Sequence, residues 1–394
     1  MYEELKTKFT KQYQKDPDYI FSAPGRTEIG GNHTDHQHGC VLAGTVNRET
    51  VAAVKANKDN RVRIDSDGYP FFEVDLNDLS VHDNEKATSV SVVRGIAARL
   101  KQLGHEVGGF DACVTSEVPA GSGLSSSAAF EVLIGTIFNE LYGCGCTPEL
   151  IAQIGQYAEN NYFGKPCGLM DQTASACGNI ITIDFKDPSK PIIKPVNFDF
   201  ATSGYALCII DTGANHADLT DDYAGITIEM KQIASHFNKE VLRDVDESDF
   251  YDRLKELRES YGDRACLRAI HFFNEQRRVA GQVKALEEND FAAFLDLIKE
   301  SGRSSWMMLQ NVIPAGSIQH QNVAFALALV EKLLSGKGAF RVHGGGFAGT
   351  IQAFVPNDIV DTFVKEVDKV LGEGSCQIMS IRNTGGGLVE DCHL

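Results

Sequence analysis

The sequence is short of positive charge. Its 394 residues include 37 lysines and arginines against 54 acidic residues, which gives a formal net charge of −17. A nucleic-acid partner requires a basic patch, so this balance argues against one. No uninterrupted apolar run is long enough to cross a membrane, and the charged N-terminal segment lacks the apolar core of a signal peptide. We therefore expect a cytoplasmic protein that binds neither nucleic acid nor membranes.

Several familiar site motifs are also absent. The ten cysteines are dispersed, and Cys144-Gly145-Cys146 is too tight for the usual spacing of zinc ligands, so reduced thiols are expected. There is no G-x-x-x-x-G-K-[ST] phosphate loop and no dinucleotide-binding fingerprint. The HGGG at 343–346 is similar to the oxyanion-hole motif of some esterases, but no serine lies in the G-x-S-x-G turn that such a hydrolase needs. A serine hydrolase is therefore disfavoured.

The organisation of the chain predicts an α+β fold. Apolar residues make up 43% of a chain that is too long for one ordinary core, so we expect two domains, 1–205 and 206–394, with the active site in the cleft between them. Residues 222–335 are expected to be mostly helical, with a charged and mobile stretch at 238–265. Strands are expected at 50–56, 61–67, 110–118, 178–186 and 204–213, and helices at 87–104, 125–143, 147–162 and 357–374.

One polar, glycine-rich stretch, GRTEIGGNHTDHQHG at 25–39, is unlike a segment of a soluble core. It holds four glycines, three histidines and two carboxylates. Side chains such as Asn, His and Asp supply many short-range hydrogen-bond donors and acceptors. We expect this stretch to form a loop that holds a small polar ligand.

A second glycine-rich stretch, VPAGSGLSSSAAFEV at 118–132, leads into an apolar helix. Gly121 and Gly123 allow the backbone to turn sharply and to approach a ligand closely. Free amides at the helix start, together with the helix dipole, form a site for anions. The hydroxyls at 125–127 can add hydrogen bonds or bind a metal ion. On this motif alone, a phosphate site and an ordinary turn with a serine cap remain equally open.

Two carboxylates follow in AENNYFGKPCGLMDQTAS at 158–175. One of Glu159 and Asp171 could hold Mg²⁺ while the other accepts a proton from a substrate hydroxyl. On spacing alone, a solvated helix glutamate and a capping aspartate are the simpler interpretation.

Together these motifs resemble those of the GHMP small-molecule kinases, and residues 24–47 resemble the sugar signature of the galactokinase branch. GSGLSSSAAFEV is similar to the family phosphate loop, AENNYFGKPCGLMDQ to the stretch that carries the catalytic aspartate, and GAFRVHGGGFAG to the third glycine motif. The likeness runs from about residue 20 to the C-terminus. It implies a two-domain GHMP-kinase-like fold and a sugar-1-kinase that uses ATP and Mg²⁺, acting as a monomer or weak homo-oligomer.

The resemblance also implies roles for individual residues. Asp171 matches the catalytic aspartate that orients or deprotonates the anomeric hydroxyl, and Arg26 matches the arginine beside it. Ser127 and Glu159 match Mg²⁺ ligands. The residues that match the ATP-phosphate loop are Gly121, Ser122, Gly123, Leu124, Ser125 and Ser126. The residues expected to contact the sugar are Asn32, His33, Asp35, His36, Gly168 and Tyr223, and those of the C-terminal glycine motif are Gly344, Gly345 and Gly346.

The sugar signature departs from the family pattern at four positions. Asn32 stands where galactokinases carry glutamate, His36 where they carry tyrosine, Glu28 where they carry asparagine, and Gly30 where they carry an aliphatic residue. Loss of a carboxylate at position 32 would permit a sugar with a carboxylate at C6. Residues 33–37 are similar to a pattern of plant galacturonate kinases. Galactose is expected first, since asparagine can also hydrogen-bond a neutral 6-hydroxyl, and galacturonate is the alternative.

A third hypothesis is a sensor that binds galactose and ATP without catalysis. Such a sensor can be damaged in its phosphate loop, whereas GLSSSAA is full length here and both Arg26 and Asp171 are present. Catalysis is therefore favoured. His33, His36 and His38 predict that activity depends on pH near neutrality.

Overall fold

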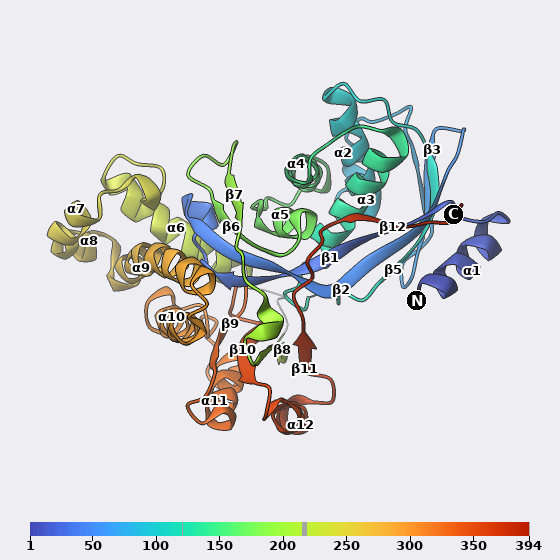
Figure 1. Ribbon diagram of the computed structural model, residues 1–394. Coiled ribbons are helices and arrows are strands. Elements are labelled where there is room, and N and C mark those ends of the chain that lie inside the picture. The colour runs from blue at the N-terminus through green and yellow to red at the C-terminus, as the bar shows by residue number, and fades with distance from the viewer. Residues whose placement is uncertain (120, 215–218, 394) are drawn as a thin grey trace.

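Two β-sheets organise the residues that the structure describes, 1–119, 121–214 and 219–393 of a computed structural model (Figure 1). The larger sheet has the order β12-β1-β2-β5-β3-β4, and β6 and β7 continue it from β2. Its strands are β1 (Tyr19–Gly30), β2 (Cys40–Ala56), β3 (Arg61–Ser66), β4 (Phe72–Asp75), β5 (Phe110–Ser116), β6 (Ile180–Asp184), β7 (Ile192–Pro195) and β12 (Gly387–Asp391). The smaller sheet has the order β11-β8-β10-β9, from β8 (Tyr205–Ala214), β9 (Ala339–Val342), β10 (Gly349–Pro356) and β11 (Cys376–Met379).

Helices cover both sheets. In Figure 1, α2 to α5 lie on one face of the larger sheet, and α1 packs against β2 and β5. Their bounds are α1 (Tyr2–Tyr13), α2 (Ser89–Gln102), α3 (Ser126–Tyr142), α4 (Pro148–Ala158) and α5 (Met170–Cys177), with the π-turn η3 (Glu159–Phe163) following α4. The apolar side chains of this layer, such as Val54, Phe110 and Leu133, form one core cluster.

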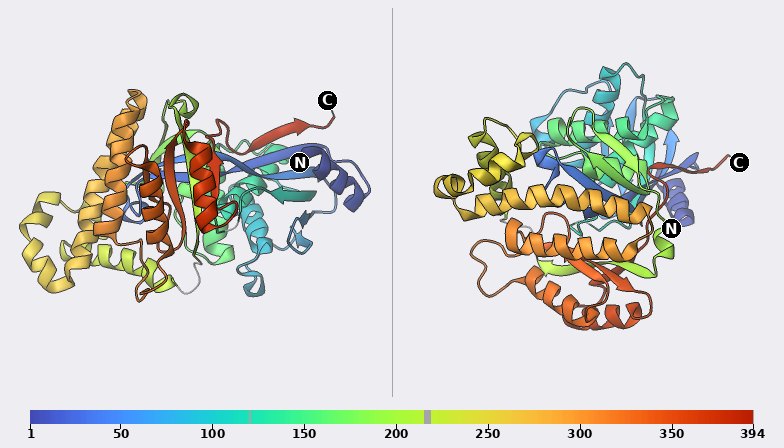
Figure 2. Two further views of the ribbon diagram at one scale, coloured as in Figure 1. Left: turned by 90° about the horizontal axis from the view of Figure 1, so that it is seen from below. Right: turned by 60° about the vertical axis from the view of Figure 1, so that its left-hand side comes forward.

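The second half is largely helical before it returns to strands. Figure 2 shows the long helices α9 (Asp263–Glu287) and α10 (Phe291–Ser304) lying side by side. Around them lie α6 (Thr220–His236), α7 (Glu247–Asp252), α8 (Leu254–Tyr261) and the π-turn η6 (Ser305–Leu309). The smaller sheet is covered by α11 (Asn322–Leu334) and α12 (Val360–Leu371). Within the described ranges, no helix is both long and apolar enough to span a membrane.

The sequence patterns predicted most of these elements. The four expected helices correspond to α2, α3, α4 with η3, and α12, and the five expected strands overlap β2, β3, β5, β6 and β8. Thr147 caps α4 as expected, since its hydroxyl accepts a hydrogen bond from the backbone N–H of Leu150 at 3.3 Å. All ten cysteines are free, in agreement with the expected reduced thiols.

Two expectations differ from the structure. Residues 25–30 belong to β1 rather than to a loop, because they pair with β2 across two bulges, so only 31–39 form the connecting loop. The stretch 238–265 is folded into short helices, because Leu242, Phe250 and Leu257 are buried in a common cluster. The expected boundary at 205/206 lies after the first residue of β8, and β12 from the second half pairs with β1 in the larger sheet, so the division into two domains stays a prediction.

Candidate active site

An arginine and an aspartate from distant parts of the chain form a paired contact. Arg26 lies on β1 and Asp171 lies in the first turn of α5. The Nε and Nη2 atoms of Arg26 donate to the two carboxylate oxygens of Asp171, each at 2.8 Å. Ser125 donates its hydroxyl to Asp171 Oδ2 at 2.7 Å. Arg26 is buried while Asp171 is partly exposed, so a substrate can reach the carboxylate.

This setting keeps Asp171 ionised. Burial by itself would raise its pKa, but the Arg26 guanidinium and the Ser125 hydroxyl hold the pKa of Asp171 below its ordinary value. The start of α5 adds the positive end of a helix dipole. The result is a carboxylate that carries its charge at neutral pH and can accept a hydrogen bond from a substrate hydroxyl.

The phosphate loop reaches Arg26 directly. The backbone N–H of Arg26 donates to the Leu124 carbonyl at 2.9 Å, and its guanidinium donates to the Gly123 carbonyl. Gly121 and Gly123 have φ of 75° and 72°, and Ser125 also lies in the left-handed region at 61°. These dihedrals bring the loop to the start of α3 at Ser126. The amides at that helix start are available to an anion.

A cavity of about 500 Å³ extends from this helix start. Ser126, Ser127 and Glu159 line it, as do four aromatic residues, Tyr69, Phe72, Phe130 and Phe163. Ser122 and Leu124 instead line a neighbouring cavity of about 330 Å³ against the smaller sheet. The structure therefore brings both expected metal ligands to one cavity beside the phosphate loop.

The donor atoms of this cavity fit Mg²⁺. A serine hydroxyl and a carboxylate are the oxygen ligands that this ion takes in proteins, usually together with substrate phosphates. Gln172 donates to Glu159 at 3.0 Å and to Glu131 at 2.8 Å, and Lys165 lies 3.3 Å from Glu159. Within the described ranges, no three His, Cys, Asp or Glu residues form a complete metal site.

Sequence reasoning missed Glu131. This residue is buried on α3, lines the same cavity and has an Oε1 atom without a hydrogen-bond partner among the described residues. Burial and the nearby charge of Glu159 raise the pKa of Glu131 well above its ordinary value. The available signal was a single acidic residue within the otherwise apolar run 128–134 of this helix.

The loop 31–39 forms the other side of the site. His33 lies in the left-handed region, and its Nε2 is 2.8 Å from the Gly345 carbonyl. Asp35 lies against Gly168, where an added Cβ would be only 2.6 Å from the Asp35 Oδ2 atom. Burial raises the pKa of Asp35. A side chain at position 168 would therefore displace the Asp35 carboxylate from its present position.

His36 does not behave as the sequence suggested. Its ring lies 5.7 Å from that of His33. Burial lowers the pKa of His36 to about 3, so the ring is neutral across the physiological range. The expectation that His36 makes activity sensitive to pH near neutrality is therefore wrong.

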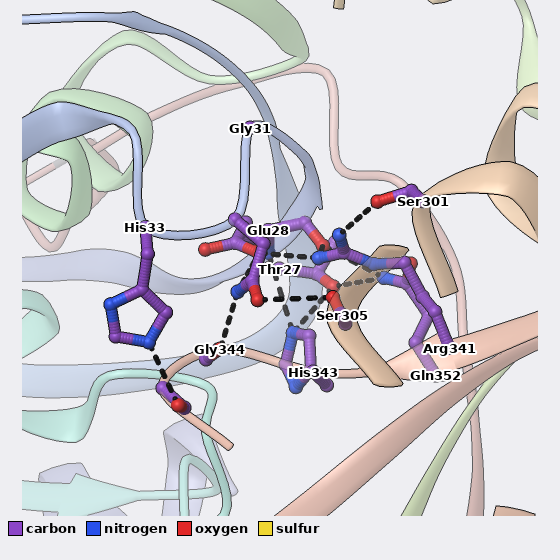
Figure 3. Close-up of polar contacts among 12 residues, drawn as sticks. Thr27, Glu28, Gly31, His33, Ser301, Ser305, Arg341, His343, Gly344 and Gln352 are labelled. Atoms are coloured by element: carbon purple, nitrogen blue, oxygen red, sulfur yellow. Dashed lines mark hydrogen bonds and ion pairs between the residues drawn. The ribbon is translucent and has the colours of Figure 1, made fainter. Parts of the chain in front are cut away.

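The third glycine motif closes the site from the other half of the chain. Tyr223 donates its hydroxyl to the Gly346 carbonyl at 2.8 Å. A Cβ at Gly345 would lie 2.8 Å from the Tyr223 ring, and a Cβ at Gly346 would lie 2.1 Å from the Asn311 carbonyl. Only glycine fits where the motif passes this close to other residues. The contact from His33 to Gly345 joins the motif to loop 31–39 (Figure 3).

Asn32 is fully buried, and its side-chain amide is already bound on both sides. The amide nitrogen donates to Glu28 Oε1 at 3.0 Å and to the Gly344 carbonyl at 2.6 Å. The amide oxygen accepts from Asn311 at 2.9 Å and from Ser305 at 3.4 Å. In this arrangement no hydrogen-bonding capacity is left for the expected contact with a sugar.

Comparisons with known proteins agree with this geometry. The family described as the GHMP kinases N terminal domain matches residues 91–179, and the galactokinase galactose-binding signature matches residues 7–56. Galactokinase from Streptomyces coelicolor is 31% identical over 364 residues, which cover 92% of this chain and 90% of that protein. Galactokinase from Glaesserella parasuis serovar 5 is 31% identical over 369 residues, with 91% of each chain covered.

A solved structure extends the likeness to three dimensions. Lactococcus lactis galactokinase complexed with galactose superposes with a TM-score of 0.83 and 26% sequence identity, and the match covers 98% of this chain and 100% of that one. The expected α+β GHMP-kinase fold is therefore confirmed. The chain belongs to the galactokinase family of the GHMP kinases, phosphotransferases that use ATP and act on an alcohol group.

Proposed function

We propose that this enzyme transfers the γ-phosphoryl group of ATP to the anomeric hydroxyl of galactose. The observation that carries the proposal is the ionised Asp171, bound by Arg26 and Ser125 and reached directly by the phosphate loop. The galactose-binding signature over residues 7–56 and the similarity to a galactokinase complexed with galactose support the choice of sugar.

Phosphoryl transfer requires mainly positioning and charge stabilisation. In this proposal Asp171 accepts the hydrogen bond of the anomeric hydroxyl and takes its proton as the new oxygen–phosphorus bond forms. The bond between the γ-phosphorus and the β–γ bridging oxygen breaks, and ADP leaves with that oxygen. Arg26 offsets the negative charge of the carboxylate and of the phosphoryl group that moves past it. The amides of the phosphate loop and of the α3 start would bind the phosphates, with Gly121 and Gly123 permitting the close approach.

The metal and the nucleotide base are assigned to the cavity beside α3. Ser127 and Glu159 would hold Mg²⁺, which when bound neutralises charge on the β- and γ-phosphates. Glu131 lines the same cavity, and the Gln172 amide donates to both Glu131 and Glu159. The aromatic side chains of Tyr69, Phe72, Phe130 and Phe163 would receive the base.

The sugar is assigned to the space between loop 31–39 and the third glycine motif. Asp35 and His33 from the loop, together with Gly168 beside Asp35, would contact the sugar hydroxyls. Tyr223 would contact the ring, in line with its place against Gly345. His36 is a further candidate in its neutral form.

The test is a coupled assay of ADP release with ATP, Mg²⁺ and a panel of galactose, galacturonate, glucuronate, galactosamine, arabinose and glucose. Fastest turnover of galactose would support the proposal. Fastest turnover of galacturonate would keep the chemistry and reassign the sugar. Galactose binding in calorimetry without any ADP release would favour a sensor and overturn the kinase mechanism.

A further inference from the structure

A buried cluster of polar side chains joins β1 and loop 31–39 to the second half of the chain (Figure 3). At its centre are Glu28 on β1 and Arg341 on β9, which are 313 residues apart in sequence. Arg341 is fully buried and donates to the Glu28 carboxylate, and it also donates to Ser301 on α10 at 3.3 Å. The mechanism proposed above uses neither residue of this ion pair.

Asn32 connects this ion pair to the third glycine motif. One hydrogen of its amide nitrogen goes to Glu28 Oε1, and the other goes to the Gly344 carbonyl at 2.6 Å. The backbone carbonyl of Asn32 accepts from His271 Nε2 at 2.9 Å. The residue is therefore held from β1, from α9 and from the glycine motif, and it is 0% exposed.

The distribution of charge explains why an amide is required at position 32. A carboxylate there would place an oxygen 3.0 Å from Glu28 Oε1 and 2.6 Å from the Gly344 carbonyl, in both cases acceptor against acceptor. At position 28 the carboxylate instead has Arg341 as its partner, and the Arg341 side chain is fully buried. A carboxylate therefore suits position 28 and an amide suits position 32. Replacing Asn32 alone with aspartate would leave the two carboxylates facing each other.

We propose that Asn32 is a positioning residue rather than a sugar ligand, and that Glu28 and Arg341 hold it so that it sets the separation between loop 31–39 and the third glycine motif. The position of Asn32 affects the proposed sugar-binding residues through two contacts with the Gly345 carbonyl. His33 Nε2 contacts this carbonyl, and Asn311 donates to it at 3.1 Å. This inference rests on the proposed function for the identity of the sugar.

The test compares steady-state constants for galactose and for ATP in four variants. In Asn32→Asp the two acceptor–acceptor contacts appear, and we expect the KM for galactose at pH 8 to rise at least about tenfold while the KM for ATP stays within about twofold. In Glu28→Gln/Asn32→Asp the new amide at position 28 can donate to the new carboxylate at position 32. We expect this double variant to recover at least about threefold in galactose KM relative to Asn32→Asp.

Two further variants separate positioning from general stability. Arg341→Met leaves the buried Glu28 carboxylate without its cationic partner and should raise the galactose KM selectively. Arg268→Met is the matched control, because Arg268 is also a buried arginine, paired with Glu229 at 2.8 Å and donating to the Leu309 carbonyl. It should lower the melting temperature and leave the ratio of the two KM values unchanged.

The outcomes decide the proposal. An unchanged galactose KM in Asn32→Asp, an equal rise in the KM for ATP, or a double variant no better than Asn32→Asp would each overturn it. If Asn32→Asp does not fold, Asn32→Ala adds no charge and should show the same selective rise, and an unchanged galactose KM there would also overturn it. A wild-type enzyme that phosphorylates no sugar would overturn the proposed function alone, and galactose binding by calorimetry would then replace KM in the same comparisons.

Discussion

At the scale of single residues, the reacting carboxylate depends on two neighbours that differ in kind. Arg26 binds both oxygens of Asp171, whereas Ser125 binds one of them. The arginine contributes a positive charge, whereas the serine contributes a neutral hydrogen bond, and both lower the pKa of Asp171. Asp171 can accept a substrate hydroxyl only because neither neighbour covers it completely.

Replacing Asp171 with asparagine tests its part in the reaction. Asp171→Asn keeps the size of the side chain but removes the charge and the ability to take a proton. We expect galactose and ATP to bind with affinities within about threefold of wild type, while kcat falls by about 10²–10⁴-fold. Calorimetric titration and ADP release would measure the two effects. Full turnover in this variant would remove Asp171 from the mechanism.

A buried histidine makes stability depend on pH. Burial lowers the pKa of His271 to about 4, whereas an unfolded histidine titrates near about 6.5. Between these values the unfolded chain binds a proton that the folded protein does not, so stability falls as the pH drops through this window. The contribution of this residue is up to about 1.4 kcal/mol per pH unit.

The variant His271→Gln isolates that contribution. At pH 7.5 it should be less stable than wild type, because the contacts of the ring to Asn32 and Ser304 are altered. As the pH falls from 6.5 towards 4 the difference should narrow, since only the wild type loses the histidine contribution. Urea unfolding at several pH values would measure it. A difference that stays constant over this range would contradict the prediction.

At the scale of elements, the phosphate loop packs closely against residues from the second half of the chain. Gly121 and Gly123 share positive φ angles, but their surroundings differ. Among the described residues, a Cβ at Gly121 would meet nothing within 4 Å, whereas a Cβ at Gly123 would lie 2.6 Å from the Thr350 hydroxyl and 2.9 Å from His343 Nδ1. His343 and Thr350 are both buried, so they have little room to move.

These two glycines form a matched pair for mutation. Both Gly121→Ala and Gly123→Ala introduce a side chain in the left-handed region, at about 1–2 kcal/mol each. Only Gly123→Ala adds the clash with Thr350 and His343. Without ligands, we expect its melting temperature to lie at least about 2 °C below that of Gly121→Ala. Equal melting temperatures in differential scanning fluorimetry would contradict this prediction, because they would show that the phosphate loop accommodates the added Cβ without loss of stability.

At the scale of the whole molecule, the two halves share a core. One apolar cluster includes Ile29 and Leu42 from the larger sheet together with Leu207, Phe294 and Phe354 from the second half. The last strand, β12, returns to pair with β1 near the N-terminus (Figure 2). Neither half can open without exposing apolar surface of the other.

This shared core predicts a single unfolding transition. Calorimetry should show one peak, and Phe354→Ala should shift the whole peak downward, because truncating a buried phenylalanine costs about 3–5 kcal/mol. Phe354 is fully buried and its ring lies 5.3 Å from that of Phe294. Two separate transitions, in either protein, would show that the halves unfold independently.

The sequence alone predicted the fold class and the family, both of which the comparisons confirm. Arg26, Ser125 and Asp171 were expected at the site because their motifs resemble those of the GHMP kinases, and the glycine-rich loop and helix start in these motifs are local in sequence. The structure brings the three residues into contact, and their roles in the reaction stay predictions. The domain boundary, the oligomeric state and the cytoplasmic location stay predictions.

Only the tertiary structure decided what Asn32, Glu131 and residues 25–30 do. Asn32 looked like a sugar ligand because its loop is polar, but its partners Gly344 and Asn311 lie 312 and 279 residues away in sequence. Glu131 had no local motif, and its role follows from the approach of Glu159 and Gln172. Residues 25–30 form a strand because polar side chains that look unsuited to a core find buried partners there, as Glu28 does with Arg341. Such long-range pairing sets the free energy of a buried polar group, and no local pattern encodes it.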